Sequence, residues 1–232
     1  MHARHGGFTL VEIAIVMVII GLLLGGILKG QEMIVQARIK NIIADFSGIS
    51  AAYHGYQDRY GALPGDDARA AGRWTTPTAA TDGDGNGQVA GTYNNANAAC
   101  VATVESCNWW DHLRRAGFVA GSGAIQPLNA VGGLIGVQTG DGAPTVGPAL
   151  GGAAGVGGFA ALMACSPNLP DKIAIATDTQ MDDGQRTAGS VRGILQTTVN
   201  PSIPADATDP AVGGANNYAE TGTNSYTLCR ML

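Results

Sequence analysis

Residues 8–28 read FTLVEIAIVMVIIGLLLGGIL, an apolar run in which Glu12 is the only charged residue. As a helix rising about 1.5 Å per residue, the run spans a hydrocarbon core of roughly 30 Å. An ionised carboxylate in that core costs several kcal/mol, so Glu12 needs a partner. Cleavage after Gly7 would free an α-amine on Phe8, about 6 Å along the helix from Glu12. The run therefore predicts a membrane helix in which processing supplies the amine that completes an ion pair with Glu12.

The stretch GFTLVEI, residues 7–13, resembles the prepilin leader and cleavage motif of type IV pilins and of the pseudopilins of type II secretion. The resemblance implies that residues 1–7 are a leader, that a prepilin peptidase cuts after Gly7, and that Phe8 is then N-methylated. It also implies that Glu12 pairs with the amine of a neighbouring subunit. The partners would be other pilin subunits, in a homopolymer or a mixed filament, and an inner-membrane assembly platform. Where many major pilins have a proline in the second half of the run, this chain has the glycines Gly21, Gly25, Gly26 and Gly30.

A secretory signal peptide or a plain membrane anchor would also place an apolar segment near the start of a chain. A signal peptide has an apolar core of about 7–15 residues before a small-residue cleavage site, and this run is longer. A plain anchor fits the length but leaves Glu12 unexplained. The basic leader, with His2, Arg4 and His5, places the start of the chain in the cytoplasm and everything after Lys29 outside. We expect residence in the lipid of the bacterial inner membrane with a periplasmic head, followed by an extracellular or periplasm-spanning filament.

Beyond the run, apolar residues form one stripe along a predicted amphipathic helix over residues 29–60. The stripe consists of Val35, Ile39, Ile42, Phe46, Ile49, Tyr53 and Tyr56. Gly61, Pro64 and Gly65 end the helix. A coiled-coil homodimer would also cover such a stripe, but continuity with the membrane helix favours packing against the chain's own globular domain.

Residues 61–232 are predicted to form a loop-rich, disulfide-stapled head domain. The chain contains 35 glycines and only 13% charged residues, a composition that favours irregular connections. A short helix is expected at residues 105–116, stopped by Gly117. Strands are expected at Ser190–Thr198 and Asn224–Leu232, and a helix at Asp171–Met181, whereas Val131–Phe159 gives no firm expectation. The predicted fold class is α+β: a long N-terminal helix packed on a small antiparallel β domain, as in pilins.

The four cysteines, Cys100, Cys107, Cys165 and Cys229, all lie in the part expected outside the cytoplasm. An even count in an oxidising compartment predicts two disulfides, for which three connectivities exist. We favour Cys100–Cys107, which closes a short loop, and Cys165–Cys229, which fastens the C-terminal strand. The lack of a Cys-x-x-Cys pair disfavours simple zinc, thioredoxin-like and covalent haem sites.

One loop resembles the first half of a calcium-binding loop. Its candidate ligands are Asp82, Asp84, Asn86 and Gln88. Position twelve would be Tyr93, which has no carboxylate, so Glu105 or Asp111 would have to complete the site. The alternative is a solvent-exposed acidic turn. Asp178, Asp182 and Asp183 form a second and poorer candidate group.

Catalysis and nucleic-acid binding find little support in the sequence. His54 and His112 have no serine or cysteine tied to them by spacing, and the glycine pairs lack the lysine of a phosphate-binding loop. Residues 61–232 contain 8 basic and 14 acidic residues, a net charge of −6 that argues against a phosphate-binding surface.

The sequence thus predicts a non-enzymatic filament subunit that requires no cofactor, with calcium as the one candidate ion. The alternatives are a minor pseudopilin of a type II secretion system and a membrane-anchored, calcium-dependent binding module. Some pilin-like proteins also resemble this chain in a tryptophan–histidine–leucine helix and in the segments Met181–Gly184 and Gly189–Arg192.

Overall fold

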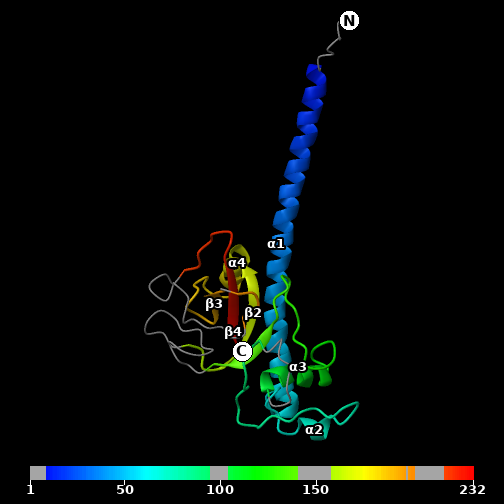
Figure 1. Cartoon of the computed structure of the whole chain (residues 1–232), viewed down its shortest axis with the longest axis vertical. Coiled ribbons are helices and arrows are strands. Elements are labelled where there is room, and N and C mark those ends of the chain that lie inside the picture. The colour runs from blue at the N-terminus through cyan, green and yellow to red at the C-terminus, as the bar shows by residue number, and fades with distance from the viewer. Residues whose placement is uncertain (1–8, 95–103, 141–157, 197, 202–216) are drawn as a thin grey trace. The chain divides into compact units, whose positions relative to one another are not determined.

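The computed structural model describes residues 9–94, 104–140, 158–196, 198–201 and 217–232 (Figure 1). The chain divides into two compact units, Met1–Arg38 and Ile39–Leu232. Helix α1, Leu10–Tyr60, contributes to both units. The domain boundaries predicted at residues 7, 28 and 60 stay predictions.

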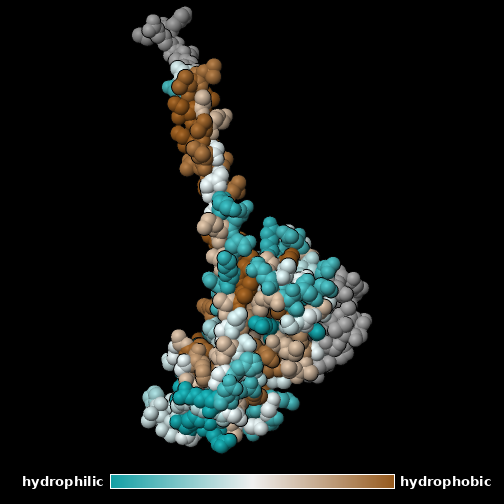
Figure 2. Space-filling model, turned by 180° about the vertical axis from the view of Figure 1, so that it is seen from behind, coloured by the Kyte–Doolittle hydropathy of each residue, from teal (hydrophilic) through white to brown (hydrophobic). Residues whose placement is uncertain are grey.

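In the first unit, α1 exposes its apolar side chains, which form the brown band on this part of the helix in Figure 2. The helix is long and apolar enough to cross a membrane, and none of its most apolar 18-residue window is buried within the protein. The exposure shows that the protein itself does not cover this surface in the described structure.

In the second unit, α1 buries one face. The buried residues include Ile39, Ile42, Phe46, Ile49, Tyr53 and Tyr56, as the stripe predicts. Val35, the first stripe residue, belongs to the first unit and is only partly buried. Gly61 follows the helix with φ 64°, and its N–H donates to the carbonyl of Gln57 at 2.8 Å. The left-handed conformation favours glycine and ends the helix.

The second unit contains one four-stranded antiparallel sheet in the order β1-β2-β4-β3. Its strands are β1 (Gly136–Thr139), β2 (Leu162–Pro170), β3 (Val191–Leu195) and β4 (Ser225–Met231). The helices are α2 (Ala70–Arg73), α3 (Glu105–Arg115) and α4 (Asp171–Met181), and α4 contacts β2, β3 and β4. The α+β, pilin-like fold class is confirmed.

The predicted helices α3 and α4 and the predicted strands β3 and β4 are present, with bounds that differ from the expected ones by up to three residues. The sequence did not predict β2, the strand that pairs with both β1 and β4. Its second half contains Pro167, Asn168 and Pro170, which disfavour a regular strand. The structure accommodates them with a register shift between Ser166 and Leu169, where Asn168 has φ 63°.

A disulfide joins the paired residues Cys165 of β2 and Cys229 of β4. Both cysteines are fully buried, in a core cluster with Tyr93, Phe159, Met163 and Ile194. The predicted Cys165–Cys229 pairing is confirmed. Cys107 is also disulfide-bonded, whereas its predicted partner Cys100 lies outside the described residues, so the Cys100–Cys107 pairing stays a prediction.

Candidate functional site

The N-terminus of α1 is closed by a reciprocal pair of polar residues. The Thr9 N–H and the Thr9 hydroxyl each donate to Oε2 of Glu12 at 2.8 Å. In return, the Glu12 N–H donates to the Thr9 hydroxyl at 3.3 Å. This arrangement is a capping box, Thr-x-x-Glu, which satisfies backbone donors that have no partner within the helix. Glu12 therefore has a role within one chain as well as the predicted role between chains.

The sequence analysis did not identify Thr9, although the Thr-x-x-Glu spacing ahead of an apolar run is a known signal for a helix start. The two processing residues, Gly7 and Phe8, lie outside the described residues. Cleavage and methylation at that bond stay predictions.

After the cap, α1 presents large apolar side chains on every side. Their exposed fractions range from 46% at Ile20 to 87% at Leu10. Exposed apolar surface of this extent on one helix marks a surface that lipid or another protein covers. Figure 2 shows this surface as one continuous band on the first part of the helix.

Residues 2–28 match the family model described as the prokaryotic N-terminal methylation motif. The chain carries the signal of type IV pilins and pseudopilins. The match supports a pilin-like or pseudopilin subunit. No curated protein and no solved structure matches this chain. The family match thus covers the N-terminal segment, residues 2–28. For the remaining residues, the contacts within the structure are the basis for any functional assignment.

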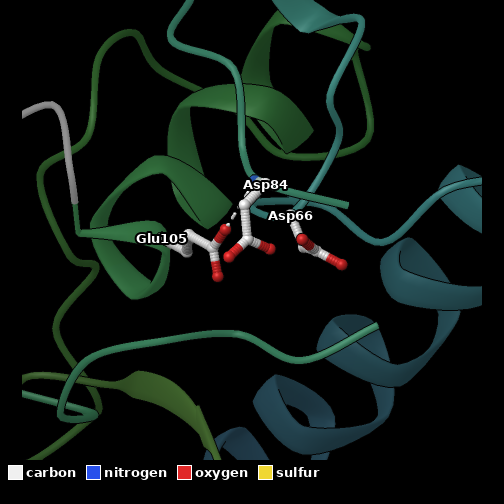
Figure 3. Close-up of side chains that lie close together, drawn as sticks. All are labelled: Asp66, Asp84 and Glu105. Atoms are coloured by element: carbon white, nitrogen blue, oxygen red, sulfur yellow. Dashed lines mark hydrogen bonds between the residues drawn. The ribbon is translucent and has the colours of Figure 1, made fainter. Parts of the chain in front are cut away.

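In the second unit of this pilin-like chain, three carboxylates come together from three segments (Figure 3). They belong to Asp66 in the loop after α1, Asp84 in the predicted calcium loop, and Glu105 at the start of α3. One oxygen of each lies within 4.8 Å of the others. Glu105 thus joins Asp84 as the sequence analysis allowed, and Asp66 is an acid that it missed.

Backbone donors occupy both buried acids of this cluster. Asp66 accepts N–H groups from Gly85, Asn86 and Gly87 at 2.6, 3.1 and 2.7 Å. Glu105 accepts them from Asp84 at 3.0 Å and Ala90 at 2.8 Å. Burial raises the pKa of Glu105, and the nearby charges of Asp66 and Asp84 act in the same direction. The two acids hold the loop in place as hydrogen-bond acceptors.

The other candidate calcium ligands make contacts of their own. Asp82 accepts the N–H of Ala71 at 2.7 Å. Asn86 donates to Asp84 at 2.8 Å through its amide and accepts the Gln88 N–H, also at 2.8 Å. Asp111 pairs instead with Arg115, with 2.6 Å between Oδ2 and Nε. Calcium at Asp82, Asp84, Asn86 and Gln88 stays a prediction.

The second acidic cluster lies where α4 ends and β3 begins. One oxygen each of Asp178, Asp182 and Asp183 lies within 4.8 Å of the others. Asp182 accepts the N–H groups of Ser190 and Val191, the latter at 3.0 Å, and thereby fixes the start of β3. Burial raises the pKa of Asp178 to about 6.

Gly189 is required beside this cluster, because a Cβ there would lie 1.8 Å from Oδ2 of Asp182 and its φ is +72°. These contacts give a structural reason for the segments Met181–Gly184 and Gly189–Arg192, which the sequence analysis noted only as a resemblance.

The histidines His54 and His112 differ in environment. His54 is exposed on α1. His112 is fully buried, its Nδ1 accepts the Gly65 N–H at 2.9 Å, and its Nε2 lies 2.8 Å from the carbonyl of Thr81. The ring is therefore neutral with its proton on Nε2, and burial lowers its pKa. Both nitrogens serve the fold.

A cluster of Tyr56, Asp67 and Arg73 joins the end of α1 to the loop that follows it. The sequence analysis did not identify this cluster. The Tyr56 hydroxyl donates to Oδ2 of Asp67 at 2.7 Å, and Arg73 forms an ion pair with the same carboxylate. Burial opposes ionisation of Asp67, but the hydrogen bonds from Arg73 and Tyr56 hold its pKa below the usual value. The sequence signal for this cluster was the acidic turn Pro64-Gly65-Asp66-Asp67. Because the turn follows the end of the helix, its acids lie close enough to bond with residues of the last helical turns.

Proposed function

We propose that this chain is a structural subunit of a type IV pilus or pilus-like filament, cleaved after Gly7 and N-methylated on Phe8. The observation that carries the proposal is the exposed apolar part of α1, whose one charge in residues 10–28, Glu12, sits at the helix start. Before assembly, lipid covers this surface. In the filament, the same surface of neighbouring subunits covers it, at about 25 cal/mol per Å² of apolar area removed from water.

Glu12 supplies the register of that packing. In the membrane its carboxylate is costly, and the capping contacts with Thr9 offset only part of the cost. Pairing with the Phe8 amine of a neighbouring subunit supplies the opposite charge. The subunit waiting in the bilayer therefore gains free energy when it joins a filament.

The role proposed is mechanical, and no reaction is assigned to the chain. The buried His112 supports this, because both of its nitrogens are engaged by backbone groups. The proposed partners are other pilin subunits, a prepilin peptidase and an inner-membrane assembly platform. A periplasmic pseudopilus of type II secretion is the alternative location for the same assembly chemistry.

The test separates the charge of Glu12 from its capping role. Glu12→Gln removes the charge but keeps an acceptor for Thr9, since glutamine also occupies this position in capping boxes. Thr9→Ala keeps the charge and removes the side-chain cap, at about 0.5–2 kcal/mol of helix stability. Each variant is expressed in a source strain with its peptidase, and the membrane and sheared-filament pools are compared with the parent.

We expect Glu12→Gln to stay membrane-inserted and cleaved but to be depleted from filaments by at least tenfold. Thr9→Ala should enter filaments near the parental level. Parental incorporation of Glu12→Gln would overturn the ion-pair mechanism and favour a plain anchor. Mass spectrometry of the mature chain should find a methylated Phe8 as its first residue, and intact Met1 would contradict the processing proposed.

A further inference from the structure

A hollow lies at the end of the sheet where β2, β4 and β3 are neighbours. Its volume is about 440 Å³, within the range of roughly 300–1,000 Å³ that small-molecule sites occupy. Asn168 contributes to it from the irregular part of β2, Gln196 from the residue after β3, and Ser225 from the start of β4. The filament function proposed above makes no use of this hollow.

The lining of the hollow is polar but uncharged. Three of its residues have carboxamide side chains, namely Asn168, Gln196 and Asn224. Three have hydroxyl side chains, namely Thr198, Thr223 and Ser225. The remaining lining residue is Val199, which is 79% exposed and gives the rim an apolar contact surface. Carboxamides and hydroxyls both donate and accept hydrogen bonds, so the hollow suits a ligand that does both without carrying a charge.

Several polar atoms of the lining are available to a ligand. The side-chain hydroxyls of Thr198 and Ser225 have no hydrogen-bond partner among the described residues. Asn224 donates its amide to the carbonyl of Ala219 at 3.1 Å, and this contact leaves its carboxamide oxygen as an acceptor. Ser225 and Asn224 are half-buried, whereas Thr198 is exposed at the rim. A ligand would therefore meet hydrogen-bonding groups both at the base and at the mouth of the hollow.

A network of carboxamides fixes the shape of one wall. The Asn168 N–H donates to Oε1 of Gln196 at 2.6 Å, and Nε2 of Gln196 donates to Oδ1 of Asn168 at 3.2 Å. The Asn168 amide also donates to Oδ1 of Asn200, whose N–H returns a bond to Oδ1 of Asn168, both at 3.0 Å. Asn168 and Asn200 have φ values of 63° and 48°, which a residue other than glycine adopts only where its surroundings fix it. The wall is thus ordered before any ligand binds, which lowers the entropic cost of binding.

We propose that this hollow binds an uncharged saccharide. Each sugar hydroxyl donates and accepts, as the carboxamides and free hydroxyls of the lining require. Val199 offers an apolar contact to the C–H face of a sugar ring. A peptide strand fits less well, because the backbone here is already paired: the Gln196 N–H donates to the carbonyl of Ser225 at 2.8 Å. The inference does not depend on whether or how the chain assembles.

A second hollow, beside the end of α1, is the internal comparison. Its volume is about 540 Å³, and its lining includes the charged residues Asp66, Asp67 and Arg69 together with Gln57. Both hollows are large enough for a small molecule, so the difference between them is the charge of the lining. Gln57 therefore serves as a carboxamide probe in a hollow to which the proposal assigns no saccharide.

The experiment uses the full chain in micelles of dodecylphosphocholine, a detergent whose headgroup contains no sugar. The chain is titrated separately with maltotriose, cellotriose and triacetylchitotriose, which are uncharged, and with tetraglycine as a peptide probe. Nuclear magnetic resonance follows the side-chain amide signals of Asn168, Gln196 and Asn224, and that of Gln57 for comparison. The variants Ser225→Ala and Thr198→Val remove the two hydroxyls that have no partner in the described structure. Ser47→Ala, which removes an exposed hydroxyl from α1, is the matched control.

We expect at least one of the saccharides to shift the three amide signals of the hollow saturably while the Gln57 signal stays unchanged. Ser225→Ala and Thr198→Val should each weaken binding by about threefold to tenfold, the range of one neutral hydrogen bond, and Ser47→Ala should bind as the parent does. Should Thr198→Val fail to fold, Ser225→Ala decides. The proposal is overturned if no saccharide gives saturable shifts, or if Ser225→Ala binds with parental affinity. Saturable shifts with tetraglycine alone would also overturn it and would identify a peptide site instead.

Discussion

The two parts of helix α1 contain similar apolar residues, but the first part exposes them and the second part buries them. Ile20, in the first unit, is 46% exposed, and Ile42, in the second unit, is fully buried. Both are isoleucines within one uninterrupted helix of 51 residues. Both parts therefore form the same helix, and what differs is whether other residues of the chain cover its apolar side chains.

The pattern of polar residues accounts for the difference. Between residues 10 and 28 a single polar side chain, that of Glu12, interrupts the apolar surface, so no single face is set apart. After Lys29, charged residues separate the apolar positions into one stripe, which a single domain can cover. The first part is thus left uncovered by the described chain, and the apolar stripe of the second part is covered within the chain. Substitutions in the two units test this division.

The largest effect is expected from a charge in the buried stripe. Ile42→Asp places an unpaired carboxylate in the core and should prevent stable folding of the second unit, since such changes exceed about 4–5 kcal/mol. The matched change Ile20→Asp should leave that unit folded and instead impair membrane insertion. Denaturant unfolding followed by the fluorescence of the buried Trp109 and Trp110, together with membrane fractionation, measures both. A lower unfolding midpoint in Ile20→Asp would contradict the division.

Removal of the buried disulfide should be the next largest effect. The bridge between Cys165 and Cys229 spans 64 residues, for which the chain-entropy model gives about 4 kcal/mol. Cys165→Ala combined with Cys229→Ala should lower the free energy of unfolding of the second unit by about that amount. Urea unfolding by tryptophan fluorescence tests this. An unchanged midpoint would show that the bridge contributes nothing to holding β2 and β4 together.

A smaller, pH-dependent effect is expected from His112. Burial lowers its pKa below the unfolded value of 6.5, so the unfolded chain takes up the proton first. The contribution is complete above pH 6.5, and stability is lost as the pH falls below that value. His112→Gln should cost about 1–3 kcal/mol at pH 7.5 through the lost contacts and should remove this part of the acid sensitivity.

The difference in unfolding midpoint between parent and His112→Gln, measured from pH 7.5 to 5, isolates this contribution. His54→Gln, on the exposed face of α1, is the control and should retain the parental profile. A constant gap between His112→Gln and the parent over this range would refute the assignment of a neutral, buried ring.

The smallest effect concerns helix glycines in the two parts. A Cβ at Gly25 or at Gly48 would meet nothing within 4 Å, so alanine fits at both positions. Each substitution should stabilise the helix by up to about 1 kcal/mol, which corresponds to roughly fivefold slower amide exchange. With Gly25→Ala the change should be local, because no packing supports that part. With Gly48→Ala, the slowly exchanging amides of the second unit should shift together. Hydrogen exchange in micelles distinguishes the two, and a local change at both sites would remove the contrast.

Much of the fold could be predicted where a single periodic signal dominates. The helix end at Tyr60, the stripe, and helices α3 and α4 follow from apolar spacing and from glycine positions. Strand β2 could not be predicted, because its prolines suit a strand only with the irregularity near Asn168. The place of Asp66 beside Asp84 and Glu105 could not be predicted either, because Asp66 is remote from the loop in sequence. Its hydrogen bonds with Gly85, Asn86 and Gly87 hold it there.

By itself, the sequence determined the pilin signal, the long helix and the single acid near its start, because these depend on residues within a few turns of one another. The tertiary structure alone decided what each buried polar group contacts. His112 is held by two backbone segments, Asp66 is satisfied by a distant loop, and Asp178 accepts the hydroxyl of Tyr218. These outcomes depend on which segments the fold brings together, and hydrogen bonding and desolvation act only once those distances are set.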